Sequence, residues 1–273
     1  MSATDPNQGR SELATRTVAG LGMAGLALVV LWLGGFTFWL ATAILGLGVI
    51  GEWADLAKVD AATKRLMLFT LSVPLAIMCP WAAGPNFFAL GLVAAAAIFT
   101  LASTRRPDLA LGMVYTGLPV LALLLIRKQP DGLVMTIWAI ALVSICDVGA
   151  FFAGRMIGGA RLAPMISPNK TWAGFFGGIV AAAAFGAVMH GFWGLPWRLT
   201  LATPVLAVVA QAGDLYESWL KRQSGVKDSG SLLPGHGGLM DRVDGMIPVA
   251  PIAAFLVMLP EIQKLLMDVV QGL

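Results

Sequence analysis

A polar stretch from Ser218 to Asp244 carries most of the reactive side chains of this chain. Its sequence, SWLKRQSGVKDSGSLLPGHGGLMDRVD, combines cations, carboxylates, an imidazole and five glycines within 27 residues. Its charged and imidazole side chains are Lys221, Arg222, Lys227, Asp228, His236, Asp241, Arg242 and Asp244. Cations and backbone N–H groups bind phosphates, and carboxylates bind the divalent metal ions that accompany phosphates. The stretch is therefore typical of a site for metal-dependent phosphate chemistry.

The second half of this stretch is predicted to be a loop, because Pro234 and the neighbouring glycines are incompatible with a regular helix. Gly237 and Gly238 would let the backbone approach a bound ligand closely, so both are candidate substrate-binding residues. His236 lies between two glycines, and we expect it to donate a hydrogen bond to that ligand.

Two carboxylates at the end of the stretch are candidate metal ligands. Asp241 and Asp244 are three residues apart at the predicted start of the last helix, where they could share one helical face and one metal ion. Oxygen ligands without cysteine favour Mg²⁺ over zinc.

A further carboxylate lies just upstream, in QAGDLYESWLKR. If the preceding helix continues through this segment, Asp214, Ser218 and Lys221 fall on one helical face. For Glu217 we expect a surface ion pair with Lys221, four residues further on.

The segment RLAPMISPNKTWAG has the features of a helix start. Ser167 is predicted to cap the helix, with Pro168 at its first position. Lys170 in the first turn and the free backbone N–H groups would then form an anion site, to which Asn169 and Thr171 could donate. An alternative explains the segment equally well: Ser167 only caps the helix, and Lys170 is one of the cytoplasmic basic residues that orient the membrane spans.

Asp147, in the run SICDVGAFFAGR, lies about two helical turns inside an apolar segment. An isolated carboxylate at that depth costs a few kcal/mol, so it needs a partner or a hydrated cavity. We favour a place in a substrate-binding cavity; the alternative is a structural pair with Arg155.

The composition excludes an ordinary soluble domain. The mean hydropathy is +0.82 and only 12% of residues are charged, whereas about a quarter are charged in typical globular chains. The isoelectric point near 9.1 does not indicate nucleic-acid binding, because the basic residues form short clusters between apolar runs. The chain is predicted to be an all-α polytopic membrane protein.

A membrane-spanning helix needs about twenty apolar residues. Nine candidate spans are Val18–Leu33, Phe36–Gly51, Leu66–Ala83, Asn86–Ser103, Leu109–Ile126, Leu133–Gly154, Trp172–Trp193, Leu199–Leu215 and Gly245–Leu265. Only Gly34 and Gly35 separate the first two, which could be a tight hairpin or one unit. We divide the chain into a polar N-terminus (1–17), N-terminal spans (18–126) and C-terminal spans that carry the site (127–273).

Loop charge orients these spans. With the N-terminus in the cytoplasm, fourteen Lys and Arg residues face inside and four face outside. The four outside residues are Arg127, Lys128, Arg198 and Lys264. This is a strong positive-inside bias, so we expect the polar stretch to face the cytoplasm, where nucleotides are available.

The pattern S-x-L-K-R-x4-K-D-x-G-x2-L-P-x-H-G-G-L-x-D-R-V-D, from Ser218 to Asp244, resembles the signature of the phosphatidate cytidylyltransferase (CDP-diacylglycerol synthase) family. The similarity extends upstream to QAGDLYES, SPNKTW and DVGAFFAGR. Two positions depart from the family pattern: Ala173 replaces an expected glutamate, and Phe151 replaces the usual tyrosine.

The resemblance implies that CTP and phosphatidate react to give CDP-diacylglycerol and pyrophosphate. It also implies a requirement for Mg²⁺, a second and monovalent cation such as K⁺, and a bacterial inner membrane as the location. Asp214 and Asp241 match the metal-binding carboxylates of the family. The other signature positions are matched by Lys221, Arg222, Lys227, Asp228, His236, Arg242 and Asp244. The resemblance leaves open whether the chain forms a homodimer.

Two other functions remain open. A CTP-dependent polyprenol or phytol kinase would also be membrane-bound and metal-dependent, but it would release CDP. A transporter could use Asp147 and Asp214 as an intramembrane ion site, although the polar groups crowd one face and no symmetric pair of broken helices is present in the sequence.

Overall fold

The computed structural model describes residues 22, 25–230 and 237–271. Residues 25–33 are helical, and Gly34, with a φ of 60°, separates them from α2 (Gly35–Leu56). The elements that follow are α3 (Ala61–Ile77), α4 (Phe87–Thr104), α5 (Pro107–Lys128), α6 (Gly132–Met156), β1 (Arg161–Ala163), β2 (Ser167–Thr171), α7 (Trp172–Trp193), α8 (Trp197–Ser224), the 3₁₀ helix η1 (Met240–Arg242) and α9 (Met246–Gln271). The predicted N-terminus 1–17 and part of the first predicted span lie outside the described residues.

Seven of the described helices, α2 and α4 to α9, are long and apolar enough to cross a membrane. Many large apolar side chains on them are exposed, for example Ile98 (67%), Phe176 (58%) and Leu201 (69%). A soluble monomer rarely exposes so much contiguous apolar surface, whereas lipid chains would cover it. The chain is a polytopic, mostly helical integral membrane protein.

The third predicted span differs from the observed helix. The prediction was Leu66–Ala83, but α3 covers Ala61–Ile77 and is only 17 residues long. It begins earlier because the Asp60 carboxylate accepts a hydrogen bond from the Ala62 N–H and caps the helix.

The predicted helix start at Ser167 is wrong, and the purely helical prediction misses a small sheet. Ser167 to Thr171 form strand β2, which pairs antiparallel with β1 and places Thr171 opposite Arg161. The helix α7 begins at Trp172, and the Thr171 hydroxyl accepts the capping hydrogen bond from the Gly174 N–H (3.1 Å). Strand pairing gives the backbone of 167–171 its hydrogen bonds, so Lys170 lies in a strand and not in a first helical turn.

The eighth helix is longer than the predicted Leu199–Leu215. α8 has 28 residues and ends at Ser224, followed by Gly225 with a φ of 74°. The conditional prediction for QAGDLYESWLKR is therefore confirmed: Asp214, Ser218 and Lys221 belong to one continuous helix.

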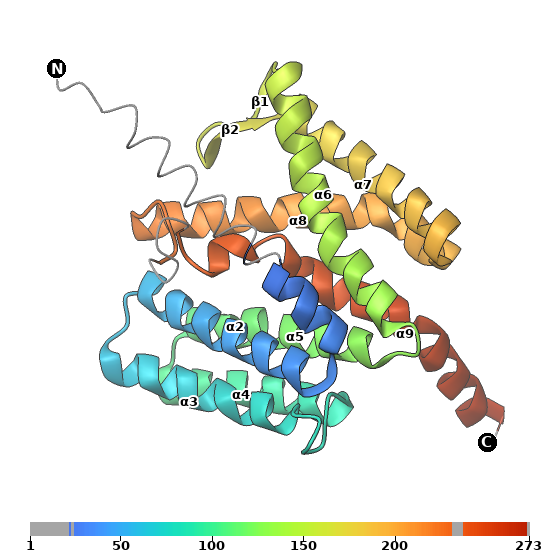
Figure 1. The fold of residues 1–273 in the computed structure, drawn as a ribbon. Helices are drawn as coiled ribbons and strands as arrows, with labels where there is room; N and C mark the ends of the chain where they lie inside the picture. Colours follow the sequence, from blue (N-terminus) through green and yellow to red (C-terminus); the bar gives the residue numbers. More distant parts are fainter. Residues whose placement is uncertain (1–21, 23–24, 231–236, 272–273) are drawn as a thin grey trace.

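Buried apolar side chains form two large clusters. The first joins α2, α3 and α4 and includes Met240 from η1, and the second joins α6, α8 and α9. Helices α5 and α9 contribute to both clusters. In Figure 1, α2 to α5 form one group, α6 and α7 lie on the other side, and α8 runs between them.

Helices α6 and α7 approach each other closely through small residues. A Cβ atom added at Gly174 would lie 2.8 Å from the Ala150 carbonyl oxygen, and one at Gly178 would lie 2.9 Å from the Cys146 carbonyl oxygen. At these distances only glycine fits, so Gly174 and Gly178 permit the close packing of the two helices. They hold α6, with Asp147, against α7.

Candidate active site

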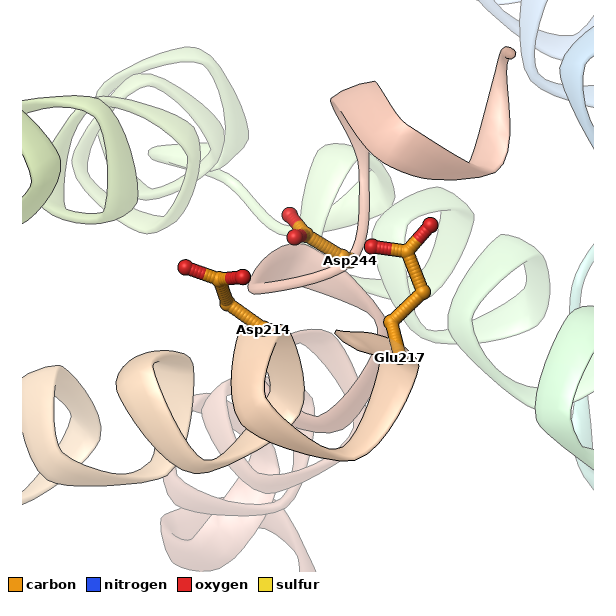
Figure 2. A group of neighbouring side chains, drawn as sticks. All are labelled: Asp214, Glu217 and Asp244. Carbon is orange, nitrogen blue, oxygen red and sulfur yellow. The ribbon is translucent and has the colours of Figure 1, made fainter. Parts of the chain in front are cut away.

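Three carboxylates converge beside the cytoplasm-facing end predicted for α8. Asp214 and Glu217 are one helical turn apart on α8, and Asp244 lies on the short link between η1 and α9. One ligand oxygen from each lies within 4.8 Å of the other two (Figure 2). Gly213 permits this approach, since a Cβ there would lie 2.7 Å from the Asp244 carbonyl oxygen.

Glu217 forms the predicted ion pair with Lys221, but the pair does not lie at the surface. Glu217 is 0% exposed, because the link before α9 covers this face of the extended α8. The Lys221 Nζ is 3.4 Å away, but within the described residues neither Glu217 oxygen has a hydrogen-bond partner. A buried carboxylate whose oxygens accept no hydrogen bond is costly, so this group is suited to a cation.

Asp241 belongs to a different set of contacts. Its Oδ1 accepts from the Lys221 Nζ (2.5 Å), and its Oδ2 accepts from the backbone N–H groups of Ser229 (3.0 Å) and Gly238 (2.8 Å). Burial alone would raise the pKa of Asp241, but these hydrogen bonds lower it to about 2. Asp241 is thus held as an anion by the chain itself.

The expectation that Asp241 and Asp244 share a helical face is wrong. Asp241 lies in η1, whereas Asp244 lies before the first residue of α9, Met246. The turn between them directs Asp241 to Lys221 and Asp244 to the carboxylates of α8. Burial, together with the nearby Asp214 charge, raises the pKa of Asp244 well above its usual range.

The hairpin of β1 and β2 brings a cation to the carboxylates. Lys170 forms an ion pair with Asp214, and Arg222 Nε donates to the Ile166 carbonyl oxygen (3.4 Å), so the hairpin is attached to α8 at two points. Asp147 on α6 interacts electrostatically with both Lys170 and Asp214. No ion pair joins Asp147 to Arg155, both of which are described.

The other predicted site residues on the hairpin and on α8 lie outside the group of three carboxylates. The Thr171 hydroxyl is occupied in capping α7, and Asn169 is exposed, with its carbonyl oxygen accepting from Arg161 (3.5 Å). Ser167 is half-buried in β2, and Ser218 is half-buried on α8.

The loop residues of the signature fall into three groups. Lys227 and Asp228 are exposed on the turn after α8, and Arg242 is exposed on η1. Gly237 and Gly238 lie beside Asp241; a Cβ at Gly237 would lie 3.1 Å from the Asp241 Oδ2. His236 lies outside the described residues.

Sequence reasoning missed Glu52. This carboxylate ends the second apolar run, yet it is 2% exposed and binds the signature loop. The signal for it was an acidic residue directly after the apolar run in GVIGEWADL, which resembles an ordinary helix end until the packing is known.

Comparison with known proteins decides the family. The model of the cytidylyltransferase family matches residues 14–259 of the chain. The chain belongs to the cytidylyltransferase family. The match includes every residue of the site described above.

Named relatives agree with the sequence signature. A phosphatidate cytidylyltransferase of Brucella suis is 38% identical over 248 residues, which is 89% of this chain and 92% of that protein. One of Staphylococcus haemolyticus is 33% identical over 255 residues, or 88% and 97% of the two chains. A third, of Staphylococcus epidermidis, is 46% identical over 129 residues, or 46% of this chain and 50% of that one. The resemblance to phosphatidate cytidylyltransferases is therefore confirmed.

Proposed function

We propose that this cytidylyltransferase transfers the cytidylyl group of CTP to phosphatidate, giving CDP-diacylglycerol and pyrophosphate. The observation that carries the proposal is the group of Asp214, Glu217 and Asp244, in which Glu217 is buried, with Lys170 and Lys221 beside it. The relatives named as phosphatidate cytidylyltransferases supply the substrate class.

The reaction is a phosphoryl-group substitution. A phosphate oxygen of phosphatidate attacks the α-phosphorus of CTP, and the bond from that phosphorus to the α–β bridging oxygen breaks to release pyrophosphate. The attacking oxygen is already anionic near neutral pH, so a strong general base is unnecessary. The protein must bring two polyanions together and stabilise the charge on the leaving group.

The carboxylate group fits a hard divalent cation. Asp214, Glu217 and Asp244 offer oxygen ligands only. The Glu217 oxygens accept no hydrogen bond from the described residues, so they are available to coordinate a cation. When bound there, Mg²⁺ would neutralise charge on the triphosphate. The second, monovalent cation remains a proposal that rests on the family resemblance.

Lysines surround this group on two sides. Lys170 pairs with Asp214 and would exchange that carboxylate for a phosphate. Lys221 forms ion pairs with Glu217 and Asp241, so its charge lies beside the same group of carboxylates. Asp147 would line the floor of the cavity, and Arg222, Lys227 and Arg242 would reduce repulsion between the incoming anions.

We further propose that the protein spans a bacterial inner membrane with nine helices and that this site faces the cytoplasm. The distribution of lysine and arginine supports the orientation. CTP would enter from the cytoplasm, and phosphatidate would enter from the bilayer.

The test is product analysis with purified protein in detergent, Mg²⁺, CTP and dioleoyl phosphatidate. We expect pyrophosphate and CDP-diacylglycerol in equal amounts, and neither when phosphatidate is omitted. Release of CDP with a long-chain alcohol as acceptor would instead support a lipid kinase. No product with either acceptor would reject both enzymes and favour the transporter.

A further inference from the structure

The N-terminal half of the chain holds the signature loop through one buried carboxylate. Glu52, near the end of α2, is 2% exposed. Its Oε1 accepts a hydrogen bond from the Leu239 N–H (2.7 Å). Its Oε2 accepts from the Met240 N–H (2.8 Å) and from the Ser229 hydroxyl (2.9 Å). Both oxygens are therefore occupied by residues 177 to 188 positions further along the chain.

Two glycines of the loop are explained by this carboxylate. A Cβ at Gly230 would lie 2.5 Å from the Glu52 Oε1, and a Cβ at Gly238 would lie 2.7 Å from the Glu52 Oε2 and even closer to the Ser229 hydroxyl that donates to this oxygen. Real side chains do not approach that closely, so any larger residue would displace the carboxylate. At these two positions glycine is needed for the approach to Glu52.

The loop is clamped between Glu52 and Asp241. The Ser229 hydroxyl lies 2.9 Å from the Glu52 Oε2 and 3.0 Å from the Asp241 Oδ2. Asp241 also accepts from the backbone of Ser229 and Gly238, and its other oxygen binds Lys221 on α8. A displacement of Glu52 would therefore be transmitted through the loop to the Lys221–Asp241 pair.

We propose that Glu52 is a positioning residue that joins the two described ends of the signature loop and fixes Asp241 relative to α8. It acts through the loop and makes no contact with substrate. The kinetic part of this inference rests on the proposed cytidylyl transfer.

A carboxylate is required because all three partners donate. A glutamine at position 52 would keep one acceptor oxygen but place an amide N–H₂ group opposite a backbone N–H donor. A buried donor without an acceptor is costly, so one end of the loop would be released. Misplacement of a catalytic group by about 1 Å can cost about 100-fold in rate.

The experiment compares Glu52→Gln with Asp55→Asn in the full-length protein. Asp55 is on the same helix and is exposed, with a 59% exposed side chain paired to Lys64, so Asp55→Asn removes the same charge without touching the loop. Hydrogen exchange followed by mass spectrometry reports the backbone amides of residues 237–242. We expect Glu52→Gln to raise exchange there about tenfold or more, and Asp55→Asn to leave it unchanged.

Kinetics provide the second measurement. We expect kcat to fall about 100-fold in Glu52→Gln, with a smaller change in KM for CTP. Ser229→Ala should lower kcat less, and the double variant should show less than the product of the two effects, because both variants loosen the same attachment of the loop to α2. Independent effects of Glu52→Gln and Ser229→Ala on kcat would overturn the proposal. It would also be overturned if Glu52→Gln and Asp55→Asn had the same hydrogen exchange at residues 237–242 and the same kcat. An inactive wild-type protein would refute the proposed function instead, and hydrogen exchange would still decide the role of Glu52.

Discussion

At the scale of single residues, the contrast between Glu217 and Asp241 supports the proposed location of the cation. Asp241 accepts from Lys221 and two backbone N–H groups, so its charge is already compensated. Glu217 is fully buried and its oxygens accept no hydrogen bond from the described residues. The geometry thus groups Asp214 with Glu217 and Asp244. The pairing of Asp214 with Asp241, which the family signature implies, stays a prediction.

Paired variants distinguish these two ligand sets. In Glu217→Gln we expect kcat to fall on the order of 100-fold or more, because the site loses one of its charges. We also expect Mg²⁺ to stop raising the thermal midpoint, since a ligand stabilises only the state that binds it. Asp241→Asn should lose activity but keep the Mg²⁺-dependent stabilisation.

The control for this pair is Glu261→Gln, an identical change at an exposed position of α9. Its activity and its response to Mg²⁺ should match those of the wild type. If Mg²⁺ stabilises Glu217→Gln fully and Asp241→Asn not at all, the metal is held by Asp214 and Asp241 instead.

At the scale of elements, the hairpin and the length of α8 place the charges. The β1–β2 hairpin delivers Lys170 to Asp214, which a helix starting at Ser167 would not do. The extension of α8 to Ser224 carries Glu217 and Lys221 beyond the apolar part of the helix, where the link before α9 covers them. Both features depend on backbone hydrogen bonds that an apolar pattern does not report.

The capping role of Thr171 gives a stability prediction. Thr171→Val removes the hydroxyl that accepts from Gly174, so we expect a loss of about 1 kcal/mol, or a thermal midpoint lower by about 2–4 °C. Thr171→Ser should restore the wild-type value. Thr136→Val is the control, because the buried Thr136 hydroxyl only donates to a carbonyl of its own helix. An equal loss in both variants would contradict the cap.

At the scale of the whole molecule, α5 and α9 connect two apolar clusters, and the site lies where the second cluster meets the loop held by α2. The N-terminal helices therefore do more than cover the catalytic half. Glu52 couples them to the signature loop through three hydrogen bonds.

The proposed orientation predicts which loops are accessible from each side of the membrane. Lys128, at the end of α5, and Gln223, near the end of α8, are both exposed. In a background where Cys79 and Cys146 are replaced by alanine, we expect a membrane-impermeant maleimide to label Lys128→Cys in intact cells. The same reagent should label Gln223→Cys only after the cells are permeabilised. The reverse pattern would invert the orientation.

The sequence alone determined the protein class and the family signature, and it predicted where the chemistry takes place. Apolar runs of about twenty residues can only be buried in lipid or in a large core, and the fixed polar positions from Ser218 to Asp244 are close together in the chain. The shared helical face of Asp214, Ser218 and Lys221 was predictable on the condition that the helix continues, because helical spacing is local.

Only the tertiary structure decided which carboxylates meet. The pair of Glu217 with Lys221 was predictable because its four-residue spacing is a local signal, whereas its burial comes from a link that precedes α9. The separation of Asp241 from Asp244 depends on where η1 ends, and the role of Glu52 depends on contacts 177 to 188 residues apart. Spacing in a sequence reports neighbours within a helix, but long-range contacts are set by how the helices pack, which no local pattern encodes.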